Sequence, residues 1–294
     1  LIIFKSDEDN IFDLEYNEIV NLFEKYGVII FRGFDLTIDE LKTITDLYTD
    51  KYTNDALRRN SRFGYNSIHD VDIGYDSHLL HSESSYSPAW PEIIWFFCNI
   101  PPIKGGSTIL CDGLNLWNQF SIEAKELFLS EPFQYEIEIP VKVKIKGKGI
   151  QKWIKGGLGT NGYIDWDKGI FHLTVLRYLV NESRIGSSMC FSNHLLAQEK
   201  FINDPQILNT TMKTVSGKTI PKNIKIEIND LADRLTYDHV WEKNDLLMID
   251  NKRFMHGRRL IVEDDPRDIV IVQSQRASFG YGSTTRKKIC SQPN

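Results

Sequence analysis

The sequence is poor in cysteine, and the few cysteines it has are scattered. Cys98, Cys111, Cys190 and Cys290 form no C-x-x-C pair in a chain of 294 residues. Disulfide frameworks need many paired cysteines, and structural zinc sites need thiolates at short fixed spacing, so both are excluded. The pattern is typical of reduced thiols and predicts a cytoplasmic protein.

Long apolar runs and strong charge are also lacking. No stretch approaches the roughly 20 apolar residues of a membrane-spanning helix, and we expect no signal peptide and no membrane partner. The net charge is only −5, which argues against nucleic acid or an anionic membrane surface as a partner. No repeat of 20–50 residues is visible, so solenoid architectures are excluded too.

The composition is that of a packed globular protein. Hydrophobic residues make up 41% of the chain and aromatic residues 12%. A chain of this length forms one large domain or two small ones. We predict a single domain that spans residues 1–294.

Local patterns near the N-terminus predict a helical and β scaffold. Apolar residues at helical spacing predict a helix over 15–26, and the run at 28–31 predicts a buried strand. A second helix is expected within 36–50. There, Thr37 and Glu40 have the spacing of a capping box, in which the two side chains satisfy backbone groups at the helix start.

Two less regular stretches are expected to border a pocket. Residues 51–80 are polar and predict a long loop, and such loops in compact domains are often lids. Residues 172–240 predict a mixed insertion that forms part of the pocket rim. Between them, 134–147 alternates with period 2 and predicts a strand pair at a sheet edge. His69 and His78 in the loop are expected to be ordinary surface or core residues.

Apolar runs predict further strands in the middle and at the end of the chain. Residues 93–98 and 107–110 are separated by prolines and glycines, which predicts a hairpin-like corner. Residues 245–250 and 268–275 are also predicted strands. The segment 262–268 is predicted to be a hairpin loop before the last of them.

The short motif His81-Ser82-Glu83 is the first candidate for chemistry. On a strand, positions i and i+2 point to the same face, so an imidazole and a carboxylate could reach one ion. By itself the pair is weak, because a chain with 7 His and 40 acidic residues contains such a match by chance. A buried histidine bonded to a neighbouring acid explains the pair equally well.

A distant His256 strengthens the metal interpretation. His81, Glu83 and His256 form a 2-His-1-carboxylate set, which binds one face of an octahedral Fe(II) and leaves the other positions open. The set contains no thiolate, so it is unlike a closed zinc site. Arg267 follows His256 by 11 residues, and its guanidinium is suited to bidentate pairing with a carboxylate.

The order of these motifs resembles a known family. G-V-I-I-F-R-G-F, then H-S-E, G-G-S-T, D-N-x-x-x-x-H-G-R and a final Arg resemble the TauD/TfdA family of Fe(II)/2-oxoglutarate dioxygenases over residues 16–276. The stretch 78–113 more closely resembles the clavaminate-synthase-like and syringomycin-biosynthesis branch. The resemblance implies a mostly β fold with flanking helices, the double-stranded β-helix or jelly roll, with the mixed insertion outside it.

The resemblance also implies roles for individual residues. His81, Glu83 and His256 match the Fe(II) ligands. Thr108, which follows His81 by 27 residues, and Arg267 match the residues that bind the distal carboxylate of the co-substrate 2-oxoglutarate; O₂ is the second co-substrate. Two alternatives stay open for Arg267. It pairs with a neighbouring aspartate of the turn, or another arginine, such as Arg276, is the anchor.

The branch resemblance indicates a small-molecule substrate. It implies hydroxylation of an unactivated C–H bond in an amino acid or an amino-acid-derived metabolite, free or tethered to a carrier protein, in specialised biosynthesis. Tyr86, Asn193, Arg258 and Arg259 are candidates to face this substrate, whereas the neighbouring His194 is expected to be structural.

Other outcomes at the same site are also considered. Related halogenases carry a small residue in place of the carboxylate ligand, so Glu83 favours hydroxylation, or desaturation, over halogenation. A metal hydrolase could use the same His, Glu and His set, but it would not need Arg267. A non-catalytic jelly-roll binding protein is the third alternative.

Overall fold

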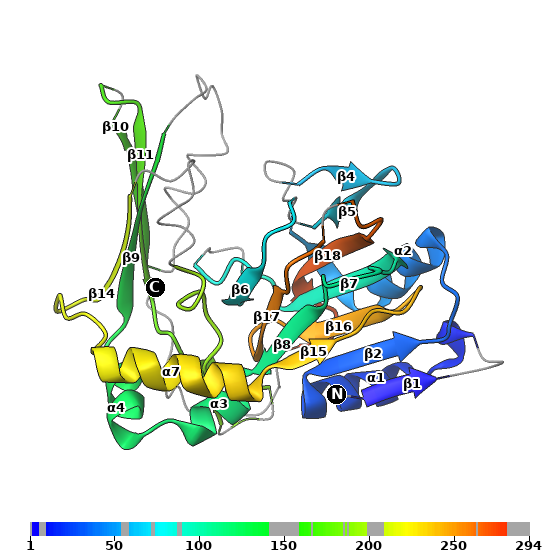
Figure 1. Cartoon of the computed structure of the whole chain (residues 1–294), viewed down its shortest axis with the longest axis horizontal. Coiled ribbons are helices and arrows are strands. Elements are labelled where there is room, and N and C mark those ends of the chain that lie inside the picture. The colour runs from blue at the N-terminus through cyan, green and yellow to red at the C-terminus, as the bar shows by residue number, and fades with distance from the viewer. Residues whose placement is uncertain are drawn as a thin grey trace.

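The computed structural model describes most of the chain. The described residues are 2–5, 10–53, 59–71, 74–86, 90–140, 159–165, 167–184, 186, 188–198, 209–262 and 264–280. They form two sheets that face each other, helices on the outside, and a third sheet (Figure 1). None of the described helices has the length and apolar character needed to cross a membrane.

The large sheet is built mainly from strands that are far apart in the sequence. Its order is β1 (Ile2–Lys5), β2 (Val28–Arg32), β16 (Leu246–Asp250), β7 (Ile93–Ile100), β18 (Asp268–Ala277), β5 (Tyr65–Asp70) and β4 (Ser61–Arg62), with β3 (Thr49–Tyr52) also paired to β18. Strands β2, β7 and β16 are apolar on both faces because both faces are covered. The strand predictions for 28–31, 93–98, 245–250 and 268–275 are confirmed.

The small sheet carries the strands that matter for the candidate site. Its order is β15 (Tyr237–His239), β8 (Thr108–Asp112), β17 (Phe254–Arg258) and β6 (His78–His81). A core cluster that includes Ile94, Phe96, Leu247 and Ile271 fills the space between the two sheets. Successive strands β5 to β8 and β15 to β18 alternate between the sheets, which is the jelly-roll arrangement.

Helices cover the outer face of the large sheet. After a short 3-10 turn (Ile11–Asp13), α1 (Tyr16–Tyr26) and α2 (Ile38–Leu47) pack their apolar sides against it. The expected capping box is present, since the Thr37 side chain accepts from Glu40 N and the Glu40 side chain accepts from Thr37 N. Both predicted helices are confirmed.

The segment between β8 and β15 forms a layer of its own. It contains α3 (Gly113–Gln119), α4 (Ile122–Ser130), α7 (Lys222–Leu235), the β12–β13 pair (Asn181–Glu182, Met189–Cys190) and a third sheet ordered β10 (Thr160–Asp165), β11 (Ile170–Arg177), β9 (Phe133–Pro140) and β14 (Asn209–Thr214). This sheet stands beside α7 and projects away from the two jelly-roll sheets (Figure 1). Its apolar residues join those of the helices and of the outer face of the small sheet.

Several expectations about connections were wrong. Residues 51–80 do not form one long loop, because β4, β5 and β6 lie within that range and β5 pairs with β18. The links between β7 and β8 and between β17 and β18 are not hairpins, since each crosses from one sheet to the other. A strand in a jelly roll pairs with a distant strand, and this pairing leaves no local signal in the sequence.

The inserted layer also differs from its prediction. β9, expected at a sheet edge, has β11 on one side and β14 on the other. The lysine-rich residues 141–147 that suggested an edge lie outside the described residues. The insertion begins before residue 172, because β9 and β11 belong to the same sheet. The predicted end at residue 240 is too late, because the range then includes β15, which belongs to the jelly roll.

Candidate active site

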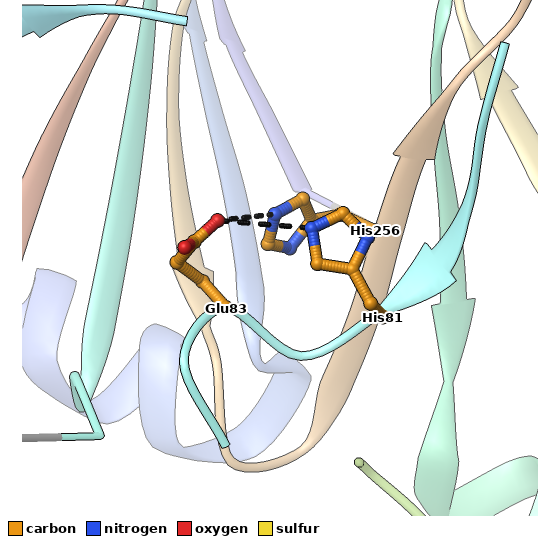
Figure 2. Close-up of side chains that lie close together, drawn as sticks. All are labelled: His81, Glu83 and His256. Carbon is orange, nitrogen blue, oxygen red and sulfur yellow. Dashed lines mark ion pairs between the residues drawn. The ribbon is translucent and has the colours of Figure 1, made fainter. Parts of the chain in front are cut away.

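His81, Glu83 and His256 lie together at one end of the small sheet. His81 ends β6, His256 lies on β17, and the two residues are direct cross-strand partners. Glu83 Oε2 is 3.7 Å from His81 Nε2 and 4.0 Å from His256 Nε2 (Figure 2). One ligand atom of each residue lies within 4.8 Å of the others, so the three side chains can bind one ion.

Glu83 reaches this position from a turn rather than from a strand. β6 ends at His81, and the next residues form a turn in which Ser84 has a φ of 53°. The expectation that His81 and Glu83 share a strand face was therefore wrong, although the two side chains do meet. The turn also lets the Ser84 hydroxyl donate to Glu83 Oε1 at 3.3 Å, which leaves Oε2 facing the imidazoles.

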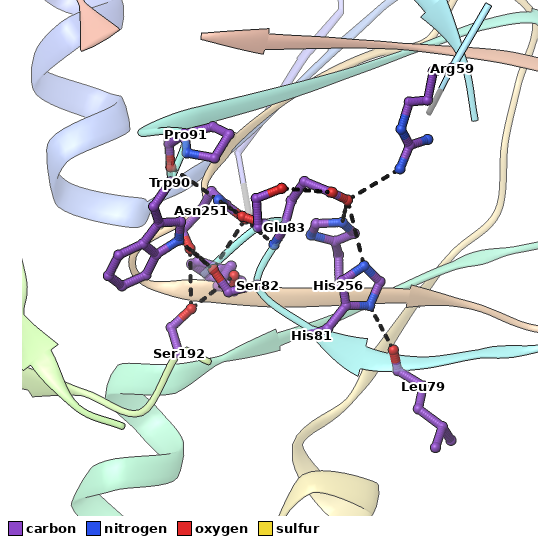
Figure 3. A network of polar contacts seen from close by, with 12 residues as sticks. Arg59, Leu79, His81, Ser82, Glu83, Trp90, Pro91, Ser192, Asn251 and His256 are labelled. Atoms are coloured by element: carbon purple, nitrogen blue, oxygen red, sulfur yellow. Dashed lines mark hydrogen bonds and ion pairs between the residues drawn. The ribbon is translucent and has the colours of Figure 1, made fainter. Parts of the chain in front are cut away.

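Asn251 holds this turn against the chain that leads into β17. Its side-chain oxygen accepts from Glu83 N at 2.8 Å, and its amide group donates to the carbonyl oxygens of Glu83 and Pro91, each at 3.0 Å (Figure 3). Ser82 Oγ donates to Asn251 O at 2.6 Å. Asn251 is fully buried. In the sequence Asn251 was seen only as part of the motif D-N-x-x-x-x-H-G-R, and its bracing role was missed.

The hydrogen bond made by His81 prepares it as a ligand. His81 Nδ1 lies 2.8 Å from Leu79 O (Figure 3). A carbonyl oxygen can only accept, so Nδ1 carries a proton and Nε2 is the nitrogen left to bind a metal. That is the nitrogen nearest Glu83, and such a hydrogen bond commonly orients a metal-binding histidine.

The charges around the cluster suit a metal site. Burial works against the charged carboxylate, but the Arg59 guanidinium and the imidazoles outweigh it and hold the pKa of Glu83 well below its usual value. Burial, followed by the neighbouring His81, lowers the pKa of His256 well below its ordinary value. The cluster therefore offers an anionic oxygen and a neutral ring nitrogen. Two imidazoles and one carboxylate without a thiolate fit Fe(II).

Thr108 and Arg267 line the same pocket as the three candidate ligands. Thr108 begins β8 and is 3% exposed. Arg267 Nε donates to Gly106 O at 3.3 Å, and a Cβ on Gly106 would lie 3.1 Å from Arg267 Cδ. The glycine of G-G-S-T thus leaves room for the arginine. Burial and then the charge of Arg258 lower the pKa of Arg267 to about 10, so a bound carboxylate would stabilise this cation.

The candidates for the arginine anchor have different surroundings. Asp268 pairs with Arg62 at 3.1 Å, and Asp265 accepts from the backbone N of Arg267 at 3.1 Å. Arg276 has a side chain that is 65% exposed and pairs with Asp50. It does not belong to the residues that line the pocket. Arg267, unlike Arg276, therefore lines the pocket that contains the three candidate ligands, as Arg59 and Arg258 also do.

The candidate substrate residues have different surroundings. Arg258 lines the pocket and donates through Nη2 to the carbonyl oxygens of Gly74 and Asp76, at 2.7 and 2.6 Å. The Arg259 side chain is 52% exposed and pairs with Asp238. Only Arg258 of these two is brought to the metal cluster.

Asn193 and Tyr86 are buried beside the turn that carries Glu83, called here the ligand turn. The Asn193 side chain donates to Leu179 O and accepts from Leu195 N, each at 2.8 Å, and its carbonyl accepts from Ser82 N. These bonds hold its own segment and the ligand turn. Tyr86 is buried with its ring centroid 5.3 Å from that of His194. Neither Asn193 nor Tyr86 is among the residues that line the pocket.

The histidines outside the cluster have different surroundings, and His78 was not expected at the pocket. His194 lies between Tyr86 and His81, with ring centroids 5.3 Å from each, and His78 lines the pocket. Within the described part of the chain, the metal-binding group contains His81 and His256 but not His69, His78 or His194. Arg59, by contrast, was missed by sequence reasoning. Its Nη2 lies 3.4 Å from Glu83 Oε2 (Figure 3).

Comparisons with known proteins identify the family. A family model described as taurine catabolism dioxygenase TauD, TfdA family matches residues 5–273. A search of curated proteins gave no match.

Solved structures show the same fold at low identity. AAD-2 in complex with Mn(II) and N-oxalylglycine is 19% identical, with a TM-score of 0.58 over 95% of this chain and 96% of that one. PvcB from Pseudomonas aeruginosa is 12% identical, with a TM-score of 0.56 over 90% and 81%. A candidate alpha-ketoglutarate dependent 2,4-D dioxygenase from Burkholderia xenovorans is 17% identical, with a TM-score of 0.55 over 89% and 87%. The predicted jelly-roll fold is confirmed.

Proposed function

The chain belongs to the TauD/TfdA family of Fe(II)- and 2-oxoglutarate-dependent dioxygenases, and we propose that it hydroxylates an unactivated C–H bond of a small molecule. The observation that carries this proposal is one pocket lined by His81, Glu83, His256, Thr108 and Arg267. When bound there, Fe(II) with 2-oxoglutarate and O₂ supplies the oxidising chemistry.

The side chains that line the pocket have different roles. His81, Glu83 and His256 would hold the metal. Thr108 and Arg267 bind the distal carboxylate of 2-oxoglutarate and so fix its orientation. Val71, Phe96 and Ile271 add apolar walls that keep water from the reacting centre. Because Glu83 fills the third ligand position, we favour hydroxylation, with desaturation as the alternative, over halogenation.

The substrate proposed is an amino acid or an amino-acid-derived metabolite, free or tethered to a carrier protein. Among the described residues that line the pocket, the guanidinium groups of Arg59, Arg258 and Arg267 outnumber the carboxylate of Glu83. That balance supports an anionic substrate beside the co-substrate. PvcB, one of the similar structures, is described as an oxygenase from an isonitrile synthetic pathway, which supports a place in specialised biosynthesis by analogy.

Anaerobic titration tests the proposal directly. Fe(II) together with 2-oxoglutarate should give a weak visible charge-transfer band in the wild-type protein. His81→Ala and Glu83→Ala should lose the band, and His172→Ala, a change on β11 of the third sheet, should keep it. Variants of His81 and Glu83 that retain the band would contradict the site.

A second measurement separates the dioxygenase from a metal hydrolase and from a binding protein. In air, the wild-type protein with Fe(II) should convert 2-oxoglutarate to succinate, slowly without a substrate and faster with one. A hydrolase would leave 2-oxoglutarate unchanged, and so would a non-catalytic protein.

A further inference from the structure

The indole of Trp241 is bonded to the hydroxyl of Thr108. Trp241 Nε1 donates to Thr108 Oγ1 at 3.2 Å, and both side chains are buried, at 4% and 3% exposed. Trp241 belongs to the core cluster between the two jelly-roll sheets, together with Phe96 and Ile271, which also line the pocket. The tryptophan therefore touches Thr108 from the interior while Thr108 faces the candidate co-substrate site.

This bond determines what the Thr108 hydroxyl offers to a ligand. An indole N–H can only donate, whereas a threonine hydroxyl has one proton to donate and two lone pairs that accept. Trp241 occupies a lone pair and leaves the proton available. In the part of the chain that the structure describes, Trp241 is the only hydrogen-bond partner of this hydroxyl. Its proton is thus available to an acceptor in the pocket, such as a carboxylate oxygen.

A network of hydrogen bonds around the buried Asp245 holds the segment that carries Trp241. Arg32, at the end of β2, donates to both carboxylate oxygens of Asp245, at 2.7 and 2.6 Å, and to Val240 O at 3.0 Å. Asp245 also accepts from Glu242 N at 2.8 Å. Residues 240 and 242, on either side of Trp241, are thereby fixed to the large sheet. The arginine of F-R-G-F acts at this point and is not among the described residues that line the pocket.

We propose that Trp241 is a positioning residue for 2-oxoglutarate: its indole holds the Thr108 hydroxyl as a donor aimed at the distal carboxylate, and Arg32 and Asp245 hold the segment that carries it. The inference rests on the proposed function, because it assumes that Thr108 and Arg267 bind that carboxylate. Trp241 contacts neither the metal nor 2-oxoglutarate, but it sets the affinity for 2-oxoglutarate.

The test is the affinity for 2-oxoglutarate, read from the visible band under anaerobic conditions with saturating Fe(II). Trp241→Phe keeps an aromatic ring but removes the N–H donor. The affinity for 2-oxoglutarate should therefore fall about tenfold, as expected for the loss of one hydrogen bond in a buried site. The matched control is Trp95→Phe. Trp95 is also buried and donates to a hydroxyl, Ser274 Oγ, at 3.0 Å, but it lies in the cluster under the helices. Trp95→Phe should leave the affinity for 2-oxoglutarate unchanged.

A double-mutant cycle shows whether the effect passes through Thr108. Thr108→Val should weaken 2-oxoglutarate binding, and adding Trp241→Phe to it should weaken binding no further. In steady state, Trp241→Phe should raise the KM for 2-oxoglutarate and leave kcat nearly unchanged. Unchanged affinity in Trp241→Phe, or an equal loss with and without Thr108, would overturn the inference.

The wild-type protein provides a measurement that does not depend on the stability of a variant. With Zn(II) in place of Fe(II), adding 2-oxoglutarate should shift the ¹⁵N-indole resonance of Trp241 and leave that of Trp95 in place. An unmoved Trp241 resonance at saturation overturns the inference. Failure of the wild-type protein to bind 2-oxoglutarate would instead overturn the proposed function, so the two failures are distinguishable.

Discussion

The two ends of the pocket are built in different ways. At the metal end, Glu83 lies on a turn that is held by hydrogen bonds between the Asn251 side chain and the backbone. At the co-substrate end, Thr108 lies on β8, where strand pairing on both sides fixes its backbone. The metal end therefore depends on a few polar side chains for its shape. The co-substrate end has a fixed shape, and its side chains set affinity.

The largest expected effect is the loss of a ligand at the metal end. His256→Ala should weaken Mn(II) binding by more than about 100-fold, beyond the loss typical of residues that only support a ligand. The backbone at this position is part of β17, so the fold should survive. Isothermal titration with Mn(II) measures the change, and His172→Ala should bind as the wild type does. Retained Mn(II) binding in His256→Ala would remove this residue from the ligand set.

Asn251→Ala tests whether the turn at the metal end depends on its brace. The change removes the acceptor for Glu83 N and both donors to carbonyl oxygens. Mn(II) affinity should fall about 10- to 100-fold, as for other supporting residues. The buried groups left unpaired should also lower the free energy of unfolding by about 1–3 kcal/mol.

The control for this variant is an asparagine on the surface. Asn223, on α7, donates to Glu123 at 3.2 Å in an exposed position. Asn223→Ala should change neither Mn(II) affinity nor thermal unfolding. If Asn251→Ala binds Mn(II) like the wild type, the turn keeps its shape without the brace, and the contrast between the two ends fails.

Arg267→Ala tests the co-substrate end. A buried arginine bonded to a carboxylate contributes about 2–5 kcal/mol when truncation leaves the partner unpaired, so 2-oxoglutarate affinity should fall about 100-fold. Mn(II) affinity without 2-oxoglutarate should not fall, because Arg267 is not part of the ligand group. The matched control is Arg276→Ala, which removes an exposed arginine nine residues later in the chain. Equal effects of the two changes would contradict the placement of the anchor.

The elements of the fold that were predictable from the sequence have local causes. The capping box of Thr37 and Glu40 and the left-handed Gly27 mark helix boundaries within a few residues. Continuous apolar runs mark the strands of the large sheet. Which strands pair could not be predicted, since β6 and β17 are separated by most of the chain and contact each other through backbone groups that every sequence has.

The same distinction applies to the site. The residues brought together in the pocket, such as His81 and Thr108, belong to motifs with characteristic spacing. Asn251, Arg59 and Trp241 were not assigned a role because each acts through a hydrogen bond or ion pair to a segment distant in sequence. Asparagine, arginine and tryptophan are common in turns, surfaces and cores, so the residue type alone does not indicate such a role.

The smallest effect expected is at Arg59, where the metal end carries a cation of its own. Arg59 Nη2 lies 3.4 Å from Glu83 Oε2, the oxygen that also faces both imidazoles, and both side chains are under 10% exposed. A dication bound to that oxygen must displace this contact and is repelled by the guanidinium. Arg59→Met should therefore strengthen Mn(II) binding, by about tenfold for a partly screened charge.

The sign of this change is what makes Arg59→Met informative. Arg62→Met, three residues later, removes a half-buried guanidinium that pairs with Asp70 and Asp268 instead, so Mn(II) affinity should stay as in the wild type. Weaker Mn(II) binding in Arg59→Met would mean that the guanidinium orients Glu83 for the metal, as Asn251 does. Stronger binding means that Arg59 balances the buried carboxylate until a metal takes its place, and that the turn and the residues that brace it, Asn251 among them, shape the metal end without Arg59.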